Sequence, residues 1–257
     1  MEKLKLNFTH NNSVAQIILD DGKANILDSV MMEELQNVLV SFKNNTQLKL
    51  ITFEGGGKNF SFGASVDEHK KEFAAIMLRE FHQLFYLIRD LAIPTAAKIS
   101  GQCLGGGFEL ALMCNFIFVD KTAKLGQPEI LLGVFPPPAS LILPEKIGLA
   151  RAEDLLITGK TIAADEAKTI GLVNELFENQ NTMETEITKW IELNIIPKSA
   201  SSLRFVVKAA RAKFNHVFSN FLPQLENIYV NQLMETDDAN EGINSFLEKR
   251  KPNWKNS

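Results

Sequence analysis

The chain has few of the residues on which several classes of protein depend. Among its 257 residues are only two cysteines and four histidines. Cys103 and Cys114 form no C-x-x-C pair, and neither has the Cys/His spacing of a zinc site. The histidines are also scattered without the spacing of a metal-dependent hydrolase. We therefore expect two buried thiols and no bound metal.

Long apolar segments are also missing. No run of about 18 uninterrupted apolar residues occurs, as a membrane-spanning helix would require. The N-terminal residues MEKLKLNFTHNN lack the apolar stretch of a signal peptide. These absences predict a soluble cytoplasmic protein that makes no membrane contact.

An excess of positive charge is absent as well, since the formal net charge is −4. Such a balance exerts no general attraction on nucleic acid, although Lys249, Arg250 and Lys251 form a local basic cluster. We expect no nucleic-acid partner. With 45% hydrophobic residues the chain can bury a large core, as one large domain or two.

The apolar periodicity predicts an α/β protein. A strand, strand, helix, strand order is expected, followed by a long helix and a further strand, at residues 4–9, 14–19, 29–42, 48–53, 68–91 and 95–99. From about residue 183 the pattern is helical, with Pro197 and Pro223 predicted to interrupt it. We place a boundary near residue 195, which divides the chain into residues 1–195 and 196–257.

The stretch from Ile99 to Gly133 carries the strongest chemical signal. Three glycines at 105–107 open an apolar helical run, and glycines before a helix leave backbone N–H groups free to bind an oxyanion. Glu109 follows in the first turn, and Glu129 follows a proline. Two carboxyls in different surroundings can divide acid and base work. Each glutamate alone is equally well explained as a structural charge.

A second glycine-rich loop precedes this stretch. Gly55-Gly56-Gly57-Lys58 lacks the spacing of a phosphate-binding loop, because Asn59 follows the lysine. Gly63 lets the backbone bend sharply and turn the N–H of Ala64 toward a ligand. No G-x-S-x-G nucleophile elbow is formed here.

These residues resemble the crotonase (enoyl-CoA hydratase/isomerase) superfamily. The segments GQCLGGGFELALMCNFIFV and KLGQPEILLGVFP look like its two hydratase signatures, and TDDANEGINSFLEKRKPNWK is similar to its C-terminal signature. The resemblance covers nearly the whole chain. It implies a spiral core of ββα units over residues 1–195. It also implies a helical region over residues 196–257 that builds homotrimers, commonly paired into homohexamers.

The resemblance also implies roles for particular residues. The backbone N–H groups of Ala64 and Gly106 correspond to the oxyanion hole, which grips the thioester oxygen of an acyl-CoA substrate. Glu109 corresponds to the base that polarises water, and Glu129 to the group that handles the proton at the α carbon. No permanently bound cofactor is implied, because coenzyme A arrives as part of the substrate.

Residues that bind coenzyme A are implied in the same way. The pantetheine arm passes Phe62 and Ala64, and backbone carbonyls near Phe60 and Phe62 line part of the adenine pocket. Lys23 and Ala24 lie in the GKAN segment at the CoA-binding loop, and Lys249 lies where the family often reaches a CoA phosphate. Either lysine can equally be a solvated surface charge.

Both glutamates together favour hydration, since isomerases of the superfamily often keep only the acid at the position of Glu129. The segments FSFGASVDEH and GVFPPPAS are similar to the cyclohexa-1,5-diene-1-carbonyl-CoA hydratases. Ser65 and the proline run 136–138 depart from many simple hydratases, which predicts a differently shaped acyl pocket. The alternatives are a straight-chain enoyl-CoA hydratase, an enoyl-CoA isomerase and an RNA-binding protein on the same fold.

Overall fold

A six-stranded sheet forms the centre of the computed structural model, which describes all 257 residues. The first two strands make the predicted antiparallel hairpin, and the other strands join it in parallel. In spatial order the strands are β1 (Leu4–Thr9), β2 (Val14–Leu19), β3 (Leu50–Gly55), β4 (Thr95–Ile99), β6 (Phe116–Asp120) and β9 (Glu175–Phe177).

A smaller three-stranded sheet lies beside it, made of β5 (Gln102–Leu104), β7 (Lys124–Gly126) and β8 (Thr161–Ala163). β5 and β7 pair in parallel, and β7 pairs with β8 in antiparallel. β5 leads directly into the helix that begins with the three glycines. The short sheet therefore sets the position of that helix start.

Ten α-helices and three short 3₁₀ helices surround the sheets. The α-helices are α1 (Ser29–Ser41), α2 (Lys71–Leu91), α3 (Gly105–Met113), α4 (Pro137–Ile147), α5 (Leu149–Thr158), α6 (Ala164–Thr169), α7 (Gln180–Asn194), α8 (Ala200–Ala210), α9 (Ala212–Asn231) and α10 (Asp237–Leu247). The 3₁₀ helices are η1 (Val66–His69), η2 (Pro128–Leu132) and η3 (Leu233–Glu235). None of the helices is both long and apolar enough to cross a membrane.

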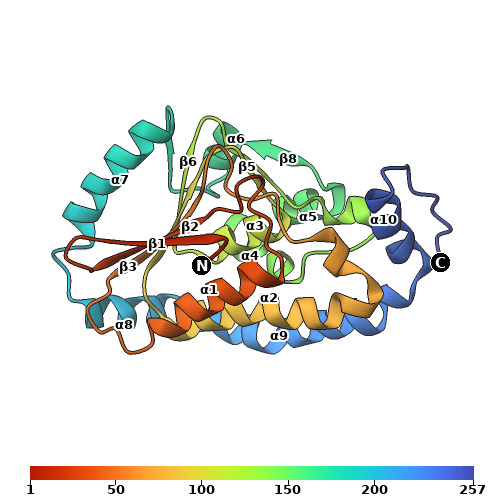
Figure 1. Ribbon diagram of the computed structural model, residues 1–257, viewed down its shortest axis with the longest axis horizontal. Helices are drawn as coiled ribbons and strands as arrows, with labels where there is room; N and C mark the ends of the chain where they lie inside the picture. The colour runs from red at the N-terminus through yellow and green to blue at the C-terminus, as the bar shows by residue number, and fades with distance from the viewer.

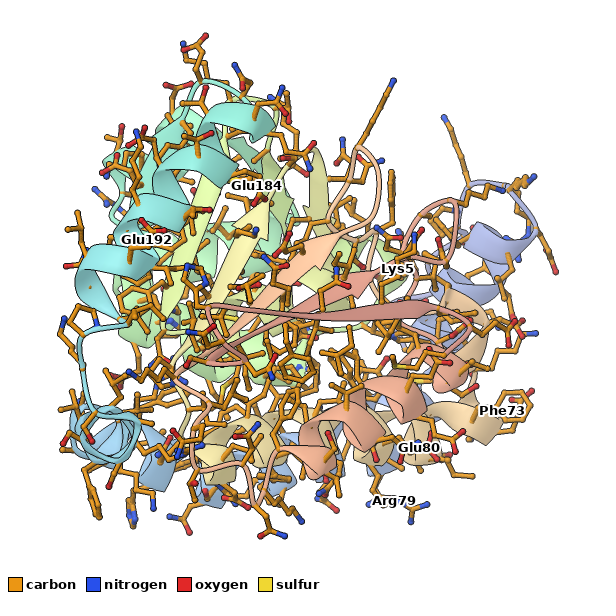
Figure 2. All side chains as sticks on the ribbon, turned by 60° about the vertical axis from the view of Figure 1, so that its left-hand side comes forward. Lys5, Phe73, Arg79, Glu80, Glu184 and Glu192 are labelled. Carbon is orange, nitrogen blue, oxygen red and sulfur yellow. The ribbon has the colours of Figure 1, made fainter.

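The helices form layers on the two faces of the large sheet. Figure 1 shows α1, α2 and α9 packed side by side beneath it, with α10 at the end of the molecule near the C-terminus. On the other face α7 covers the strands, and Figure 2 shows Glu184 on the side of α7 nearest to them. There Glu184 and Glu54 both bind the ammonium group of the buried Lys98 on β4, at 2.6 and 2.7 Å.

The C-terminal helices contribute to the main hydrophobic core. Phe218, Leu222 and Tyr229 of α9 and Ile243 of α10 belong to the same buried cluster as the strands. The chain leaves α7 at the place where the sequence predicts a boundary. That division into residues 1–195 and 196–257 remains a prediction.

One prediction about the helices is wrong. Pro223 does not interrupt the chain but lies inside α9, which continues to Asn231. A proline in a helix removes one hydrogen bond and crowds the preceding turn. Phe218 and Leu222 before the proline and Tyr229 after it are all buried. This tertiary packing keeps the helix continuous, because it outweighs the free-energy cost of the proline.

The close packing of α10 against η2 generates a first prediction. A Cβ placed on Gly242 of α10 would lie only 2.1 Å from the backbone oxygen of Leu132 in η2. Gly242→Ala should therefore force the two helices apart and lower the free energy of unfolding by about 1–3 kcal/mol. Denaturant unfolding measures this.

The matched control is Asn244→Ala, an exposed position on the same helix whose side chain makes no hydrogen bond. We expect its stability to stay within about 0.5 kcal/mol of the parent. Equal stabilities for the two variants would show that the Gly242 contact does not hold α10 in place.

Candidate active site

The start of α3 lies against the loop that carries Ala64. A Cβ placed on Gly106 would lie 3.2 Å from the backbone nitrogen of Ala64. Gly63, at φ +103°, and Gly105, at φ +50°, both adopt the left-handed conformation that this approach requires. The two N–H groups that the sequence predicts as an oxyanion hole are thus side by side.

The Ala64 loop is held on both sides by backbone hydrogen bonds. Towards β5, the N–H of Ser61 donates to Gln102 and that of Leu104 donates to Ser61, both at 3.0 Å. Towards the first loop of the chain, the N–H of Leu27 donates to the oxygen of Gly63 at 2.9 Å. These hydrogen bonds hold the backbone on both sides of Ala64, and none of them uses the N–H of Ala64 itself.

Neither predicted donor is used within the chain. The N–H groups of Ala64 and Gly106 donate to no oxygen of the protein. Gly106 is the second residue of α3, where the helix leaves N–H groups unpaired and partially positive. Two free donors at a helix N-terminus can bind an oxygen that gains negative charge.

Glu109 lies in the second turn of α3, one turn later than the sequence indicated, and is only 4% exposed. Its Oε1 accepts a hydrogen bond of 2.9 Å from the N–H of Ala139 in α4. Burial raises the pKa of Glu109 to about 8, and the Ala139 N–H opposes this rise. The carboxyl therefore releases its proton near neutral to mildly basic pH.

Glu129 approaches from η2, on the other side of the glycine turn. A Cβ on Gly105 would lie 2.9 Å from its Oε1. The buried Gln127 amide, in the orientation that its surroundings favour, donates to both carboxyl oxygens of Glu129 at 2.9 and 3.1 Å. Burial, and then the charge of Glu109, raise the pKa of Glu129 well above its ordinary value.

The two carboxyls form a coupled pair in unequal surroundings. Glu109 has the backbone donor of Ala139, whereas the ionisation of Glu129 is opposed by a neighbouring carboxylate. Because each charge opposes the other, the pair does not readily lose both protons. One ionised and one protonated carboxyl can therefore exist together at this place.

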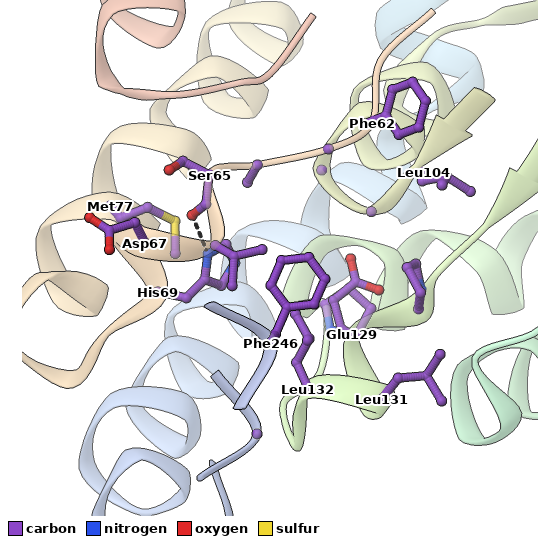
Figure 3. Close-up of a pocket in the computed structure, with 18 of the residues that line it drawn as sticks. Phe62, Ser65, Asp67, His69, Met77, Leu104, Glu129, Leu131, Leu132 and Phe246 are labelled. Carbon is purple, nitrogen blue, oxygen red and sulfur yellow. Dashed lines mark hydrogen bonds between the residues drawn. The ribbon is translucent and has the colours of Figure 1, made fainter. Parts of the chain in front are cut away.

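All these groups open into one cavity of about 750 Å³. Figure 3 shows Glu129 in the wall of this cavity, which Leu104 of β5, Leu132 of η2 and Phe246 of α10 also line. His69 of η1 also lines the cavity, and its Nδ1 donates to the oxygen of Ser65 at 2.8 Å. Most of the remaining wall is apolar, made by residues such as Met77, Leu78, Phe81, Leu131, Phe135, Pro136 and Pro137.

The predicted CoA-binding residues are placed in different ways. Ala24 and Phe62 line the cavity. Phe60 is fully buried, and its backbone oxygen accepts from Asn25 Nδ2 at 3.1 Å. Lys23 and Lys249 are exposed and do not line the cavity, so their contact with coenzyme A remains a prediction.

Two groups of the site were missed at the level of sequence. The N–H of Ala139 gives no signal of its own, since any residue there has one. Tyr229 also lines the cavity, although it lies in a helical segment with no motif around it. Both come from elements that only the three-dimensional packing brings near Glu109.

Comparison with known proteins bears directly on this geometry. The sequence profile of the enoyl-CoA hydratase/isomerase family matches residues 9–257. The chain belongs to the enoyl-CoA hydratase/isomerase family. It is an enzyme of the enoyl-CoA hydratase type, and the crotonase-family assignment expected from the signature segments is confirmed.

Several members of the enoyl-CoA hydratase/isomerase family are similar over almost their whole length. Cyclohexa-1,5-dienecarbonyl-CoA hydratase of Thauera aromatica is 41% identical over 253 residues, which cover 98% of this chain and 97% of that protein. A probable enoyl-CoA hydratase of Bacillus subtilis is 32% identical over 94% of this chain and 95% of that protein.

Solved structures of the family confirm the α/β crotonase-like fold with its C-terminal helices. An enoyl-CoA hydratase from Bacillus halodurans superposes with a TM-score of 0.86 at 21% identity, over 95% of this chain and 99% of that one. An enoyl-CoA hydratase from Bacillus anthracis superposes with a TM-score of 0.77 at 29% identity, over 99% of this chain and 100% of that one.

The burial of Glu109 generates a prediction about stability. The unfolded chain ionises Glu109 near the ordinary pKa of 4.5, whereas the folded protein holds the proton up to about pH 8. The folded state therefore binds more protons between these values, and its stability falls as pH rises. Glu109→Gln keeps an acceptor for Ala139 but cannot ionise, so it should stabilise the protein by on the order of 3 kcal/mol at pH 8.

Thermal unfolding at pH 5 and pH 8 measures this effect. The gain should shrink toward pH 5, which is close to the unfolded pKa of 4.5, because the folded and unfolded states then differ less in the number of protons they bind. Glu192→Gln, an exposed position on α7, is the control and should shift Tm at neither pH. A Glu109→Gln gain that is the same at both pH values would contradict the assigned pKa.

Proposed function

We propose that the enzyme adds water to an α,β-unsaturated acyl-CoA thioester, with cyclohexa-1,5-diene-1-carbonyl-CoA as its substrate. The observation that carries this proposal is the meeting of two free N–H groups and two carboxyls of unequal pKa in one largely apolar cavity. Hydration of a conjugated thioester needs these parts together.

The thioester carbonyl oxygen accepts from the N–H groups of Ala64 and Gly106. When water attacks the β carbon, the π electrons of the double bond move toward this oxygen and make an enolate. The two donors are already fixed where the negative charge develops, so they stabilise the transition state more than the ground state. Loss of one such donor typically raises the barrier by about 2.7–4 kcal/mol.

The two glutamates move the protons. Ionised Glu109 takes one proton from the water as the oxygen forms its bond to the β carbon. Protonated Glu129 gives its proton to the α carbon as the enolate collapses to the thioester. One C–O and one C–H bond form, the double bond is lost, and the proton on Glu109 restores the pair's original charge.

The choice of a ring substrate has two supports. The Thauera aromatica relative that shares 41% of its residues is named for that substrate. In addition, Pro136 and Pro137 line the cavity, and the proline run opens α4 just before Ala139, whose N–H binds Glu109. A stiff wall beside the base suits a rigid acyl group, because little of it has to be ordered on binding.

A straight-chain enoyl-CoA hydratase is the second candidate, since the Bacillus subtilis relative at 32% identity is named a probable enoyl-CoA hydratase without mention of a ring. An isomerase would need only one of the two acids.

We also propose that the enzyme is cytoplasmic and that its helical C-terminal region forms homotrimers or homohexamers. Phe205 and Val206 of α8 are 68% and 64% exposed, and contact between copies of the chain would cover them.

A side-by-side hydration assay tests this function. The purified protein is given cyclohexa-1,5-diene-1-carbonyl-CoA and crotonyl-CoA, and hydration is followed by loss of conjugated absorbance and gain of the mass of water. We expect preference for the ring substrate. Glu109→Gln and Glu129→Gln should each lower kcat by about 10²–10⁴-fold, because each removes one proton transfer.

Glu192→Gln serves again as the control and should keep full activity. Preference for crotonyl-CoA would leave the mechanism and reject the ring substrate. Movement of a double bond without gain of mass would identify an isomerase. Full activity in both active-site variants would reject the mechanism.

The pH dependence gives an independent prediction. Because Glu109 must be ionised to accept a proton and its pKa is about 8, kcat/KM should fall tenfold per pH unit below about pH 8. Measurement of kcat/KM between pH 5.5 and 9 tests this fall. If kcat/KM instead began to fall only near pH 4.5, the base would be a carboxyl in an ordinary, solvated setting.

A further inference from the structure

Tyr229, in the wall of the cavity, carries a buried hydroxyl that the proposed reaction has not used. Tyr229 lies on α9, is only 1% exposed, and lines the same cavity as Glu109 and Glu129. Its ring packs edge-on against Phe135, with 5.4 Å between the ring centroids. Its hydroxyl has no hydrogen-bond partner in the protein.

A buried hydroxyl without a partner is unfavourable for folding, so such groups are few in native proteins. A phenylalanine would fill the same space and pack against Phe135 without this cost. A partner that binds beside the hydroxyl would remove this cost. The place of Tyr229 in the cavity wall indicates that a bound molecule supplies the missing partner.

The surroundings fix which kind of partner it is. Burial and the nearby charges of Glu129 and Glu109 raise the pKa of Tyr229 above its ordinary value, so the hydroxyl stays neutral and can donate. Neither carboxyl accepts from it in the protein. The missing partner is thus an oxygen of a ligand on the side of the cavity where the carboxyls lie.

We propose that the Tyr229 hydroxyl donates a hydrogen bond to the oxygen that hydration adds to the substrate. This inference rests on the proposed function, because it assigns the partner from that reaction. The bond first orients the attacking water, whose protons remain available to the carboxyls. Once the C–O bond has formed, the same bond holds the hydroxyl of the product. In the reverse reaction it stabilises the departing oxygen.

Tyr229→Phe tests the proposal because it removes one oxygen and keeps the ring. We expect kcat to fall by about 10- to 100-fold while KM changes little, since the bond forms to the reacting oxygen and not to the coenzyme A part. The Tm should equal or exceed that of the parent, since an unpaired buried hydroxyl is lost. A structural role would give the opposite result, with lower Tm and unchanged kcat.

The chain offers a matched control, because it has only two tyrosines. Tyr86 lies on α2 outside the cavity wall, with the Arg89 guanidinium 4.8 Å from its ring centre. Tyr86→Phe also removes one phenolic oxygen and should leave kcat unchanged. Equal loss of activity in both variants would overturn the proposal.

Ligand binding separates this proposal from the proposed function. Calorimetry compares 3-hydroxybutyryl-CoA with butyryl-CoA, and 2-hydroxycyclohexane-1-carbonyl-CoA with cyclohexane-1-carbonyl-CoA. Tyr229→Phe should weaken binding of the hydroxylated member of at least one pair by about tenfold and leave the other member within about twofold.

Selective loss supports the proposal even if the parent protein hydrates neither test thioester, in which case only the proposed function fails. The proposal is rejected by equal loss for both members of each pair, by no loss at all, or by parent protein that binds none of the four. A Tyr229→Phe enzyme with full kcat would also reject it.

Discussion

The active site depends on a helix that is buried at both ends. All nine residues of α3 are buried, so its terminal N–H and C=O groups cannot be satisfied by bulk water. At the C-terminal end, Arg211 donates to the oxygen of Met113 at 2.8 Å, and Lys146 donates to that of Cys114 at 3.3 Å. At the N-terminal end the N–H of Gly106 is left free. The helix dipole is thus balanced by cations at one end and open to an anion at the other.

This constraint explains why the two glutamates differ. Glu109 belongs to α3 itself, so it is as deeply buried as the helix and depends on one backbone N–H from α4. Glu129 belongs to a short 3₁₀ helix that meets the glycine turn from outside and is oriented by Gln127. Burial makes both reluctant to ionise, and their mutual repulsion prevents both from ionising together. The raised pKa of both carboxyls thus follows from the packing around them.

Local features of the sequence predict the parts of the fold that depend on neighbouring residues. The hairpin, the strand at 95–99, the helix behind Asp28 and the glycine turn before α3 follow from alternation, capping and backbone freedom. The family signature adds Ala64, Gly106 and the two glutamates as one set, and the structure brings these four together.

Pro223 shows the limit of prediction from the sequence, because a local rule predicts a break where distant packing keeps α9 continuous. Tyr229 and the Ala139 N–H could not be predicted, since each comes to the site only through the packing of helices that are far apart in the chain.

The position of α10 has a consequence for shortened forms of the enzyme. Helix α10 lines the cavity with Gly242, Ser245, Phe246 and Leu247. The wall of this cavity is drawn from nearly the whole length of the sequence, from Ala24 to Pro252. A chain shortened before α10 would keep both glutamates and the glycine turn but lose part of the wall around the acyl group.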